Sequence, residues 1–169
     1  MISELKRRIF QIYTIIWTLY ATIKVKEYGK GLKVNFRCLF TKRTVIGNDC
    51  HFNGLDIIGG GNVVIGDHFH SGSGIMIITQ NHNYYSPERL PYDDKDITRD
   101  VIIGRCCWIG SRVIVLPGTI LEDGVVVQAG AVVFGKIPKG AVVGGNPYRV
   151  IKYRDLEKYE LLDQQQLYV

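Results

Sequence analysis

Aliphatic residues recur at every sixth position in the C-terminal half of this chain. The series begins at Ile103 and Ile109 and continues without interruption to Val133. A second series of mostly small or β-branched residues stands four positions after the first, from Cys107 to Ile137. A period of six fits neither a helix nor an alternating strand. It predicts a solenoid with flat faces of six residues, each an extended segment with one side chain pointing into a narrow core.

The same step is present further upstream, with one irregularity. The members are Val34, Phe40, Ile46, Phe52 and Ile58 and then, after one extra residue, Ile65, Ser71 and Ile77. Chance spacing among frequent aliphatic residues is the alternative, but six consecutive matches downstream argue against it. Glycine often follows the aliphatic residue, as expected at corners where the backbone bends. Because each coil is stabilised mainly by its neighbours, the stack needs a cap at both ends.

The repeat is broken once, by about twenty residues that begin near the sequence TQNHNYYSP, residues 79–87. A loop of this length inside a compact solenoid is usually functional. It contains His82, followed by a predicted loop over residues 83–100. Histidine titrates close to physiological pH, so it can act as a general base. The alternative is a turn histidine without a catalytic role.

The first residues of the chain predict an amphipathic helix over residues 3–26. Its apolar stripe consists of Leu5, Ile9, Ile12, Ile16, Leu19 and Ile23. The stretch is too short and too rich in threonine for a membrane-spanning helix. Two roles remain open. The helix covers the open end of the solenoid, or it lies on a membrane with its aromatic and basic residues among the headgroups.

The last residues predict a partly helical tail over residues 148–167. Asn146 followed by Pro147 has the pattern of a helix N-cap with proline at the first helical position. The strands are expected to stop just before, at Gly144 and Gly145.

Composition and charge narrow the function classes. With 169 residues, the chain is long enough for one domain with a real core. The net charge of +5 is compatible with anionic ligands, and because no nucleic-acid-binding motif is visible we expect no nucleic-acid partner. The four cysteines form no CxxC pair, which indicates reduced thiols. Without a signal-peptide cleavage pattern, we expect a cytoplasmic protein, with peripheral contact at the inner face of the membrane as an extension of this prediction.

Several motifs together resemble a known family. The repeat reads aliphatic-Gly-x-x-small-x, and it is accompanied by Trp108-Ile109-Gly110, Pro117-Gly118, Ala129-Gly130 and the Gly-x-Pro that ends at Pro147. This set resembles the hexapeptide-repeat acyltransferases, and the C-terminal half is similar to the maltose/galactoside and bacterial polysaccharide O-acetyltransferases. The resemblance implies an all-β solenoid, a left-handed parallel β-helix, that assembles as a homotrimer. We expect three segments: an N-terminal helix (1–28), the β-helix with its loop (29–146) and a helical tail (147–169).

The resemblance also implies a function. It predicts an acetyltransferase in which acetyl-CoA donates the acetyl group and a sugar hydroxyl accepts it, on a bacterial surface polysaccharide or its precursor. His82 would be the general base. One alternative keeps the enzyme but changes the acceptor to the amine of a nucleotide-linked amino sugar or of an antibiotic. Another, from a different class, is a non-catalytic β-helix that serves as a scaffold.

Site residues carry over from the family position by position. The oxyanion and acetyl site would comprise Gly110, Ser111 and Trp108, although plain packing is an equal reading for the tryptophan. The residues implied for coenzyme A are Ser111, Ala129, Gly130, Lys136, Arg149 and Lys152. Those implied for the acceptor are Asn53, Asn81, Tyr84 and Tyr85. The chain departs from the family at Phe134-Gly135-Lys136, where many relatives have Thr-Lys-Asp, so Lys136 and Lys139 are the candidate substitutes for their lysine. Arg149 and Lys152 could equally be a solvated basic turn, and Asn53 a corner asparagine.

The remaining histidines do not predict a metal site. His51 and His70 fall in one column of the expected coil, with His68 two residues before His70. Since His82 belongs to another face, the set does not converge within one chain. We therefore expect no bound metal.

Overall fold

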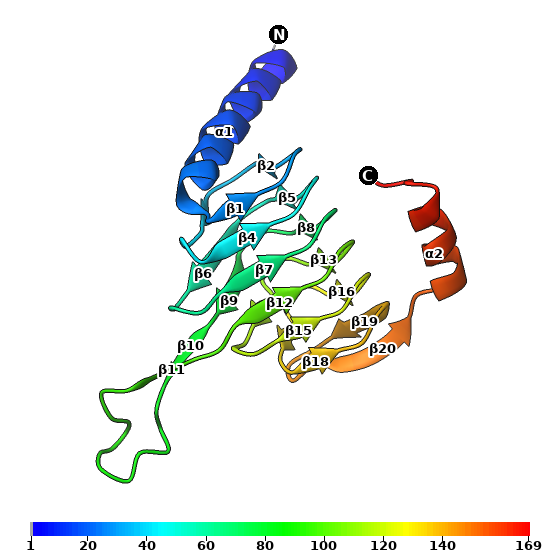
Figure 1. The fold of residues 1–169 in the computed structure, drawn as a ribbon. Helices are drawn as coiled ribbons and strands as arrows, with labels where there is room; N and C mark the ends of the chain where they lie inside the picture. The colour runs from blue at the N-terminus through cyan, green and yellow to red at the C-terminus, as the bar shows by residue number, and fades with distance from the viewer. Residues whose placement is uncertain (1) are drawn as a thin grey trace.

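Short parallel strands stack into three flat sheets that wind around one narrow core (Figure 1). The computed structural model describes residues 2–169, and Met1 lies outside the described residues. The chain passes the three sheets in turn, so about six coils lie one upon another. The predicted fold, a left-handed parallel β-helix with an N-terminal helix and a C-terminal helical segment, is confirmed.

Each sheet is named after its first strand. The β1 sheet contains β1 (Glu27–Tyr28), β4 (Thr44–Ile46), β7 (Val63–Ile65), β12 (Val101–Ile103), β15 (Ile120–Leu121) and β18 (Lys136–Ile137). The β2 sheet contains β2 (Lys33–Val34), β5 (His51–Phe52), β8 (His70–Ser71), β13 (Trp108–Ile109), β16 (Val126–Val127), β19 (Ala141–Gly144) and β20 (Arg149–Tyr153). The β3 sheet contains β3 (Cys38–Leu39), β6 (Leu55–Ile58), β9 (Ile75–Ile78), β14 (Ile114–Val115) and β17 (Val132–Val133).

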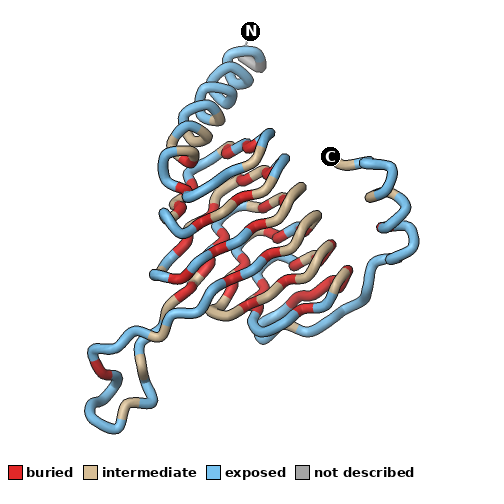
Figure 2. Tube along the Cα trace, viewed as in Figure 1, coloured by how far each residue is buried: buried red, intermediate tan, exposed pale blue. Residues whose placement is uncertain are grey.

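The core follows the six-residue period. Buried positions line the inside of every coil, while the residues between them face outward (Figure 2). From Ile103 to Val133 every member of the first predicted series is buried, and so is every member of the second, from Cys107 to Ile137. The period of six therefore identifies the inward-pointing side chains correctly in this half of the chain.

One upstream position in the predicted series is wrong. Ile58 is 47% exposed, whereas its neighbour Ile57 is buried at 6% exposure. Ile57 pairs with Ile77 of the next coil, so it occupies the core column. The spacing fails because the coil is one residue shorter after Phe52 and two residues longer before Ile65. A count of six with a single insertion cannot represent these two compensating changes.

Corner glycines are required mainly by the close approach of successive coils. A Cβ atom on Gly66 would lie 2.7 Å from the backbone nitrogen of Arg105, one coil further on. On Gly110 it would lie 2.6 Å from the backbone nitrogen of Ala129. Both distances are shorter than real contacts of a Cβ atom, so any larger residue would push the coils apart. The glycine pattern thus reports contact between coils as well as backbone bending.

The N-terminal helix α1 (Ile2–Lys24) covers the first coil with one side only. It contacts β2 and β3, and Ala21 and Val25 are buried there. Its predicted apolar stripe, by contrast, is exposed along the whole helix (Figure 2). Among the described residues, no helix has the length and apolar character needed to cross a membrane.

The C-terminal end differs in detail from the sequence-based prediction. Asn146 and Pro147 do not begin a helix; they lie in the turn between β19 and β20, which pair antiparallel. The backbone of β20 hydrogen-bonds to the open edge of β19, and the chain becomes helical only after β20. The helix α2 (Leu156–Gln164) follows, with Asp155 as its N-cap. The predicted segment boundaries after residues 28 and 146 stay predictions.

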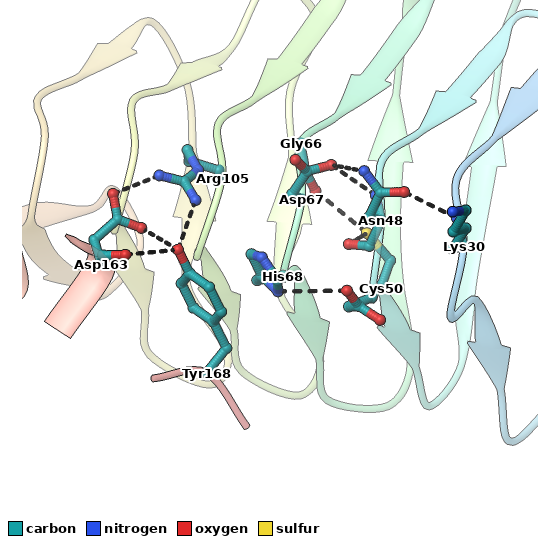
Figure 3. A network of polar contacts seen from close by, with 10 residues as sticks. Lys30, Asn48, Cys50, Gly66, Asp67, His68, Arg105, Asp163 and Tyr168 are labelled. Atoms are coloured by element: carbon teal, nitrogen blue, oxygen red, sulfur yellow. Dashed lines mark hydrogen bonds and ion pairs between the residues drawn. The ribbon is translucent and has the colours of Figure 1, made fainter. Parts of the chain in front are cut away.

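Polar contacts hold the last residues against the β-helix. Arg105 forms an ion pair of 2.5 Å with Asp163 of α2 and donates a hydrogen bond of 3.0 Å to the hydroxyl of Tyr168 (Figure 3). The ring of Tyr168 stacks on His68 at a centroid distance of 3.7 Å. The tail thereby returns to the outer face of the β2 sheet and forms one wall of an open pocket of about 340 Å³ that Trp108 also lines.

Candidate active site

The interruption of the repeat forms a hairpin that leaves the corner between the β3 and β1 sheets. Its base is an antiparallel pair of strands, β10 (Gln80–His82) and β11 (Asp96–Thr98). In Figure 1 this hairpin projects away from the stacked coils. The pairing register places His82 directly opposite Asp96. The two strands thus fix the histidine at the point where the hairpin opens into its loop.

His82 is held by two neighbours from the same hairpin. Its Nδ1 lies 3.2 Å from Oδ1 of Asp96, and its ring stacks on Tyr92 with centroids 4.0 Å apart and planes at 8°. An ionised carboxylate can only accept a hydrogen bond, so a neutral imidazole donates from Nδ1 and keeps Nε2 free as a proton acceptor. The side chain of His82 is 58% exposed, which leaves Nε2 accessible to an incoming group. This arrangement suits a general base.

The rest of the loop is ordered by its own polar contacts. Asn83 donates a hydrogen bond of 2.8 Å to Asp93, whose other oxygen accepts from the backbone of Lys95 at 2.8 Å. The bond from the Lys95 backbone is the main reason that the pKa of Asp93 is lowered. Tyr84 and Tyr85 are exposed and lie with ring centroids 4.4 Å apart. A hydrogen bond to Tyr85 raises the pKa of Tyr84.

The predicted acetyl-site residues lie at a different corner, between the β2 and β3 sheets. Trp108 is 55% exposed on the outer face of the β2 sheet, beside His70 of the preceding coil. Gly110 is buried, and its amide already donates to the carbonyl of Val127 at 2.7 Å. The hydroxyl of Ser111 accepts a hydrogen bond from a neighbouring backbone amide at 3.1 Å. Of the two predicted oxyanion donors, the amide of Ser111 is therefore the better candidate.

The structure brings together part of the predicted coenzyme A set. Ser111, Ala129 and Gly130 stack at this corner, where the amide of Gly130 donates to the carbonyl of Ser111 at 2.9 Å. Arg149 is the first residue of β20, paired with Gly144, and it lines a shallow groove with Gln128.

Two lysines of the predicted set lie elsewhere. Lys152 is on the outer strand β20, opposite Val142. Lys136 is on β18, next to the corner from which the hairpin emerges, and it forms a 2.8 Å ion pair with Glu122. That ion pair occupies the Lys136 ammonium group in this chain.

Of the predicted acceptor residues, Asn81 belongs to the hairpin and Asn53 does not. Asn81 is exposed on β10, directly before His82. Asn53 lies at the corner between the β2 and β3 sheets, where its amide donates to the carbonyl of Ser71 at 2.7 Å and accepts from Asn35 at 2.8 Å. Both ends of the Asn53 side chain are engaged between coils, which favours the corner role; acceptor binding by Asn53 stays a prediction.

His82 and Ser111 do not meet within one chain. They flank the β3 sheet on opposite sides, because Ser111 lies beside the residues that precede β9 and His82 follows β9. The four residues of β9 alone span about 13 Å. A reaction that uses both groups therefore requires a second chain.

Asp96 and Tyr92 were missed by the sequence reasoning, because their positions depend on the hairpin register. No residue pattern distinguishes Asp96 from the three other aspartates in residues 83–100.

The histidine column is present as predicted. The rings of His51 and His70 lie 4.5 Å apart. Burial is the main cause that lowers the pKa of both histidines. Among the described residues, no group of three or more histidine, cysteine or acidic side chains is arranged to hold a metal ion.

Stacked coils with faces of six residues, interrupted by one extruded hairpin in the described residues, define a class of protein, and comparison with known proteins agrees with it. The family model "Bacterial transferase hexapeptide (six repeats)" matches residues 100–135. The chain thus carries this repeat, and the predicted resemblance to hexapeptide-repeat acyltransferases is confirmed.

Among similar sequences is the Escherichia coli (strain K12) protein WbbJ, named as a candidate lipopolysaccharide biosynthesis O-acetyl transferase. It is 30% identical over 137 residues, which cover 77% of this chain and 65% of that protein. This chain therefore spans just under two thirds of that relative's length.

Two solved structures share the fold. Galactoside acetyltransferase in complex with coenzyme A is 26% identical, with a TM-score of 0.60 over 80% of this chain and 63% of the other. A hexapeptide-repeat acetyltransferase from Vibrio cholerae O1 biovar eltor, complexed with acetyl coenzyme A, has a TM-score of 0.63. It is 24% identical and covers 79% of this chain and 75% of its own, so this likeness shows the fold alone.

Proposed function

We propose that the protein is an acetyl-CoA-dependent O-acetyltransferase that acetylates a sugar hydroxyl, on a bacterial surface polysaccharide or its precursor. The observation that carries the proposal is the position of His82, which is fixed by Asp96 at the base of the only long hairpin in the described residues and has a side chain that is 58% exposed. The names of the similar O-acetyltransferases and the coenzyme A complex of one structural neighbour support the donor and the reaction type.

The reaction would proceed by direct transfer. Nε2 of His82 takes the proton of the acceptor hydroxyl while the oxygen attacks the thioester carbonyl of acetyl-CoA. The resulting oxyanion would accept a hydrogen bond from the amide of Ser111. Collapse of the tetrahedral intermediate breaks the carbon–sulfur bond. The histidine then returns its proton to the thiolate, so the products are an acetyl ester and free coenzyme A.

The assembly proposed for this reaction is a homotrimer with its sites between chains. Coenzyme A would lie along the corner formed by Ser111, Ala129 and Gly130 of one chain, with Arg149 near its phosphates. The hairpin of a neighbouring chain would supply His82 and, through Asn81, Tyr84 and Tyr85, part of the acceptor pocket. Acetyl-CoA would be found in the cytoplasm, where we place the protein.

The general base is tested by His82→Ala. We expect this variant to lose acetyl transfer while light scattering shows an unchanged trimer. Consumption of acetyl-CoA is measured across a panel of sugar and amine acceptors. Full activity of His82→Ala would refute the role of the histidine, and transfer to amines alone would favour the N-acetyltransferase alternative. Failure to bind coenzyme A in calorimetry would favour the scaffold.

The sharing of sites between chains is tested by mixing two inactive variants. His82→Ala removes the base, and Ala129→Trp fills the exposed corner proposed for coenzyme A. In a random mixture of equal amounts, about a quarter of shared sites combine an intact histidine from one chain with an intact corner from its neighbour, so about a quarter of the activity returns. Sites contained within one chain would give no recovery.

A further inference from the structure

The helix α1 has two contrasting sides. At 100° per residue, Leu5, Ile9, Ile12, Ile16, Leu19 and Ile23 lie within about 40° of one line along the helix. We call these residues the outer stripe. They are between 46% and 67% exposed, and no charged side chain interrupts them. A surface helix in water normally turns such a stripe toward the core.

The opposite side of α1 is the one that contacts the β-helix. Thr14 donates a hydrogen bond to Asn35 at 3.1 Å, and Thr18 accepts one from the backbone of Val34 at 2.9 Å. Phe10 packs edge-on against Phe36, with ring centroids 5.7 Å apart. The threonine side of the helix thus faces the protein, so the outer stripe must point away from it; Figure 2 shows most of the helix as exposed.

The positive charge of the chain is concentrated at the same end. Residues 1–43 contain ten lysines and arginines but only two acidic residues, a net charge of +8. Because the whole chain carries +5, residues 44–169 carry −3. Some of the basic residues lie beside the outer stripe: at 100° per residue, Lys6 and Arg8 stand on its two sides near its beginning, and Lys24 stands beside its end.

We propose that α1, together with the basic residues of the first coil, is a docking surface for an anionic lipid membrane. The helix would lie flat in the membrane interface, with the outer stripe in the acyl boundary and the flanking lysines and arginines among the phosphates. Tyr13 and Tyr20, beside the stripe, suit the headgroup level. A second copy of the chain is a poorer partner for this end, because each copy would bring a net charge of +8 to the contact.

Docking of this kind is independent of acetyl transfer, since the hairpin with His82 lies two coils away from α1. It would hold the enzyme where a lipid-linked saccharide is present. A soluble acceptor would still be acetylated without any membrane, so failure of docking and failure of the proposed activity give different results.

The experiment measures co-sedimentation of the full chain with vesicles of phosphatidylcholine, with and without phosphatidylglycerol. We expect binding that requires phosphatidylglycerol and weakens with salt. Ile12→Glu/Ile16→Glu should abolish it while the oligomeric state in light scattering is unchanged. Lys6→Ala/Lys24→Ala should lower the partition coefficient by about 20- to 30-fold, since each cation near an anionic surface contributes about fivefold.

The matched control places the same charge change elsewhere. Leu161→Glu/Leu167→Glu alters two leucines of the C-terminal segment that are 53% and 61% exposed, and it should leave vesicle binding unchanged. Absence of binding by the wild-type chain to phosphatidylglycerol vesicles would overturn the proposal. So would a change of oligomeric state in Ile12→Glu/Ile16→Glu with vesicle binding retained, which would assign the outer stripe to contact between copies.

Discussion

The contact between Asp96 and His82 predicts a specific kinetic defect in Asp96→Asn. In the proposed reaction the carboxylate would fix the proton on Nδ1 and stabilise the imidazolium that forms when Nε2 takes the acceptor proton. An asparagine has nearly the same shape but no charge. Because the charge interaction arises only as the proton moves, we expect kcat to fall while the KM for both substrates changes little.

The size of the effect follows from the geometry. At the observed 3.2 Å, two unit charges attract by about 1.3 kcal/mol in bulk water and about 5 kcal/mol at the permittivity typical near a protein surface. The side chains of His82 and Asp96 are 58% and 46% exposed in the single chain, so we take the lower figure. It corresponds to about a tenfold lower kcat as a minimum. The free energy of unfolding should change by less than about 1 kcal/mol, as for other exposed ion pairs.

The assay compares Asp96→Asn with Asp94→Asn in steady-state acetyl transfer. Asp94 belongs to the same loop but pairs with Arg89 and is 86% exposed, so its substitution should leave kcat unchanged. In the His82→Ala background, Asp96→Asn should cause no further loss, because the aspartate acts through the histidine. Wild-type kcat in Asp96→Asn, or an equal loss in both backgrounds, would refute the assigned role.

Three further predictions concern stability. Gly66→Ala should lower the free energy of unfolding by roughly 1–3 kcal/mol in chemical denaturation, because its Cβ would meet the backbone of the next coil at 2.7 Å. Gly60→Ala meets only a flexible side chain at 3.3 Å and should be nearly neutral. Because the pKa values of His51 and His70 are lowered in the folded protein, the unfolded chain binds more protons in acid. The melting temperature should therefore decrease as the pH is lowered below about 6.5, the ordinary pKa of histidine, and it should decrease less in His51→Gln/His70→Gln. The hydrogen bond from Tyr168 lowers the pKa of Asp163, so the tail should stay docked above pH 3.8 and detach on further acidification. Hydrogen exchange should then detect a loss of amide protection in the tail.

The coils of the β-helix could be predicted because the core residues recur at every sixth position of the sequence. A side chain such as Val115 packs against its equivalents one coil before and one coil after it, so the period of the sequence equals the period of the structure. The same reasoning failed at Ile57 and Ile58, where two aliphatic residues stand side by side and two compensating length changes flank them. The corner contacts that cause those changes are not encoded in hydrophobicity.

The two ends were harder to predict, because neither follows the repeat. The helical periodicity of α1 identified the helix but left two roles open, a cap on the solenoid or contact with a membrane. In the structure, the threonine side of α1 contacts the first coil. At the other end, Asn146-Pro147 satisfies the local rule for beginning a helix. A strand edge left open by β19 competes with that rule, and the pairing of β19 with β20 prevails.

The candidate site was predictable only where it departs from the repeat. His82 was identifiable because a solenoid that extrudes one long hairpin must gain something other than stability from it. Asp96 was not identifiable, because its contact with His82 depends on the register of β10 against β11. The spacing of residues in the sequence does not reveal that register. The conformation of the loop after His82 was not predictable either, since it is ordered by its own contacts and follows no period.

A β-helix also constrains where unlike catalytic groups can meet. Successive coils repeat the same three faces, so a residue at one corner stacks on residues of that same corner in the coils before and after it. His82 and Ser111 occupy different corners, and bringing them together within one chain would require bending the coils and opening the core between them. Placing two chains side by side brings different corners together without moving a buried residue. For a site that needs both groups, assembly is therefore a requirement of the chemistry, and it leaves the continuous core of each chain intact.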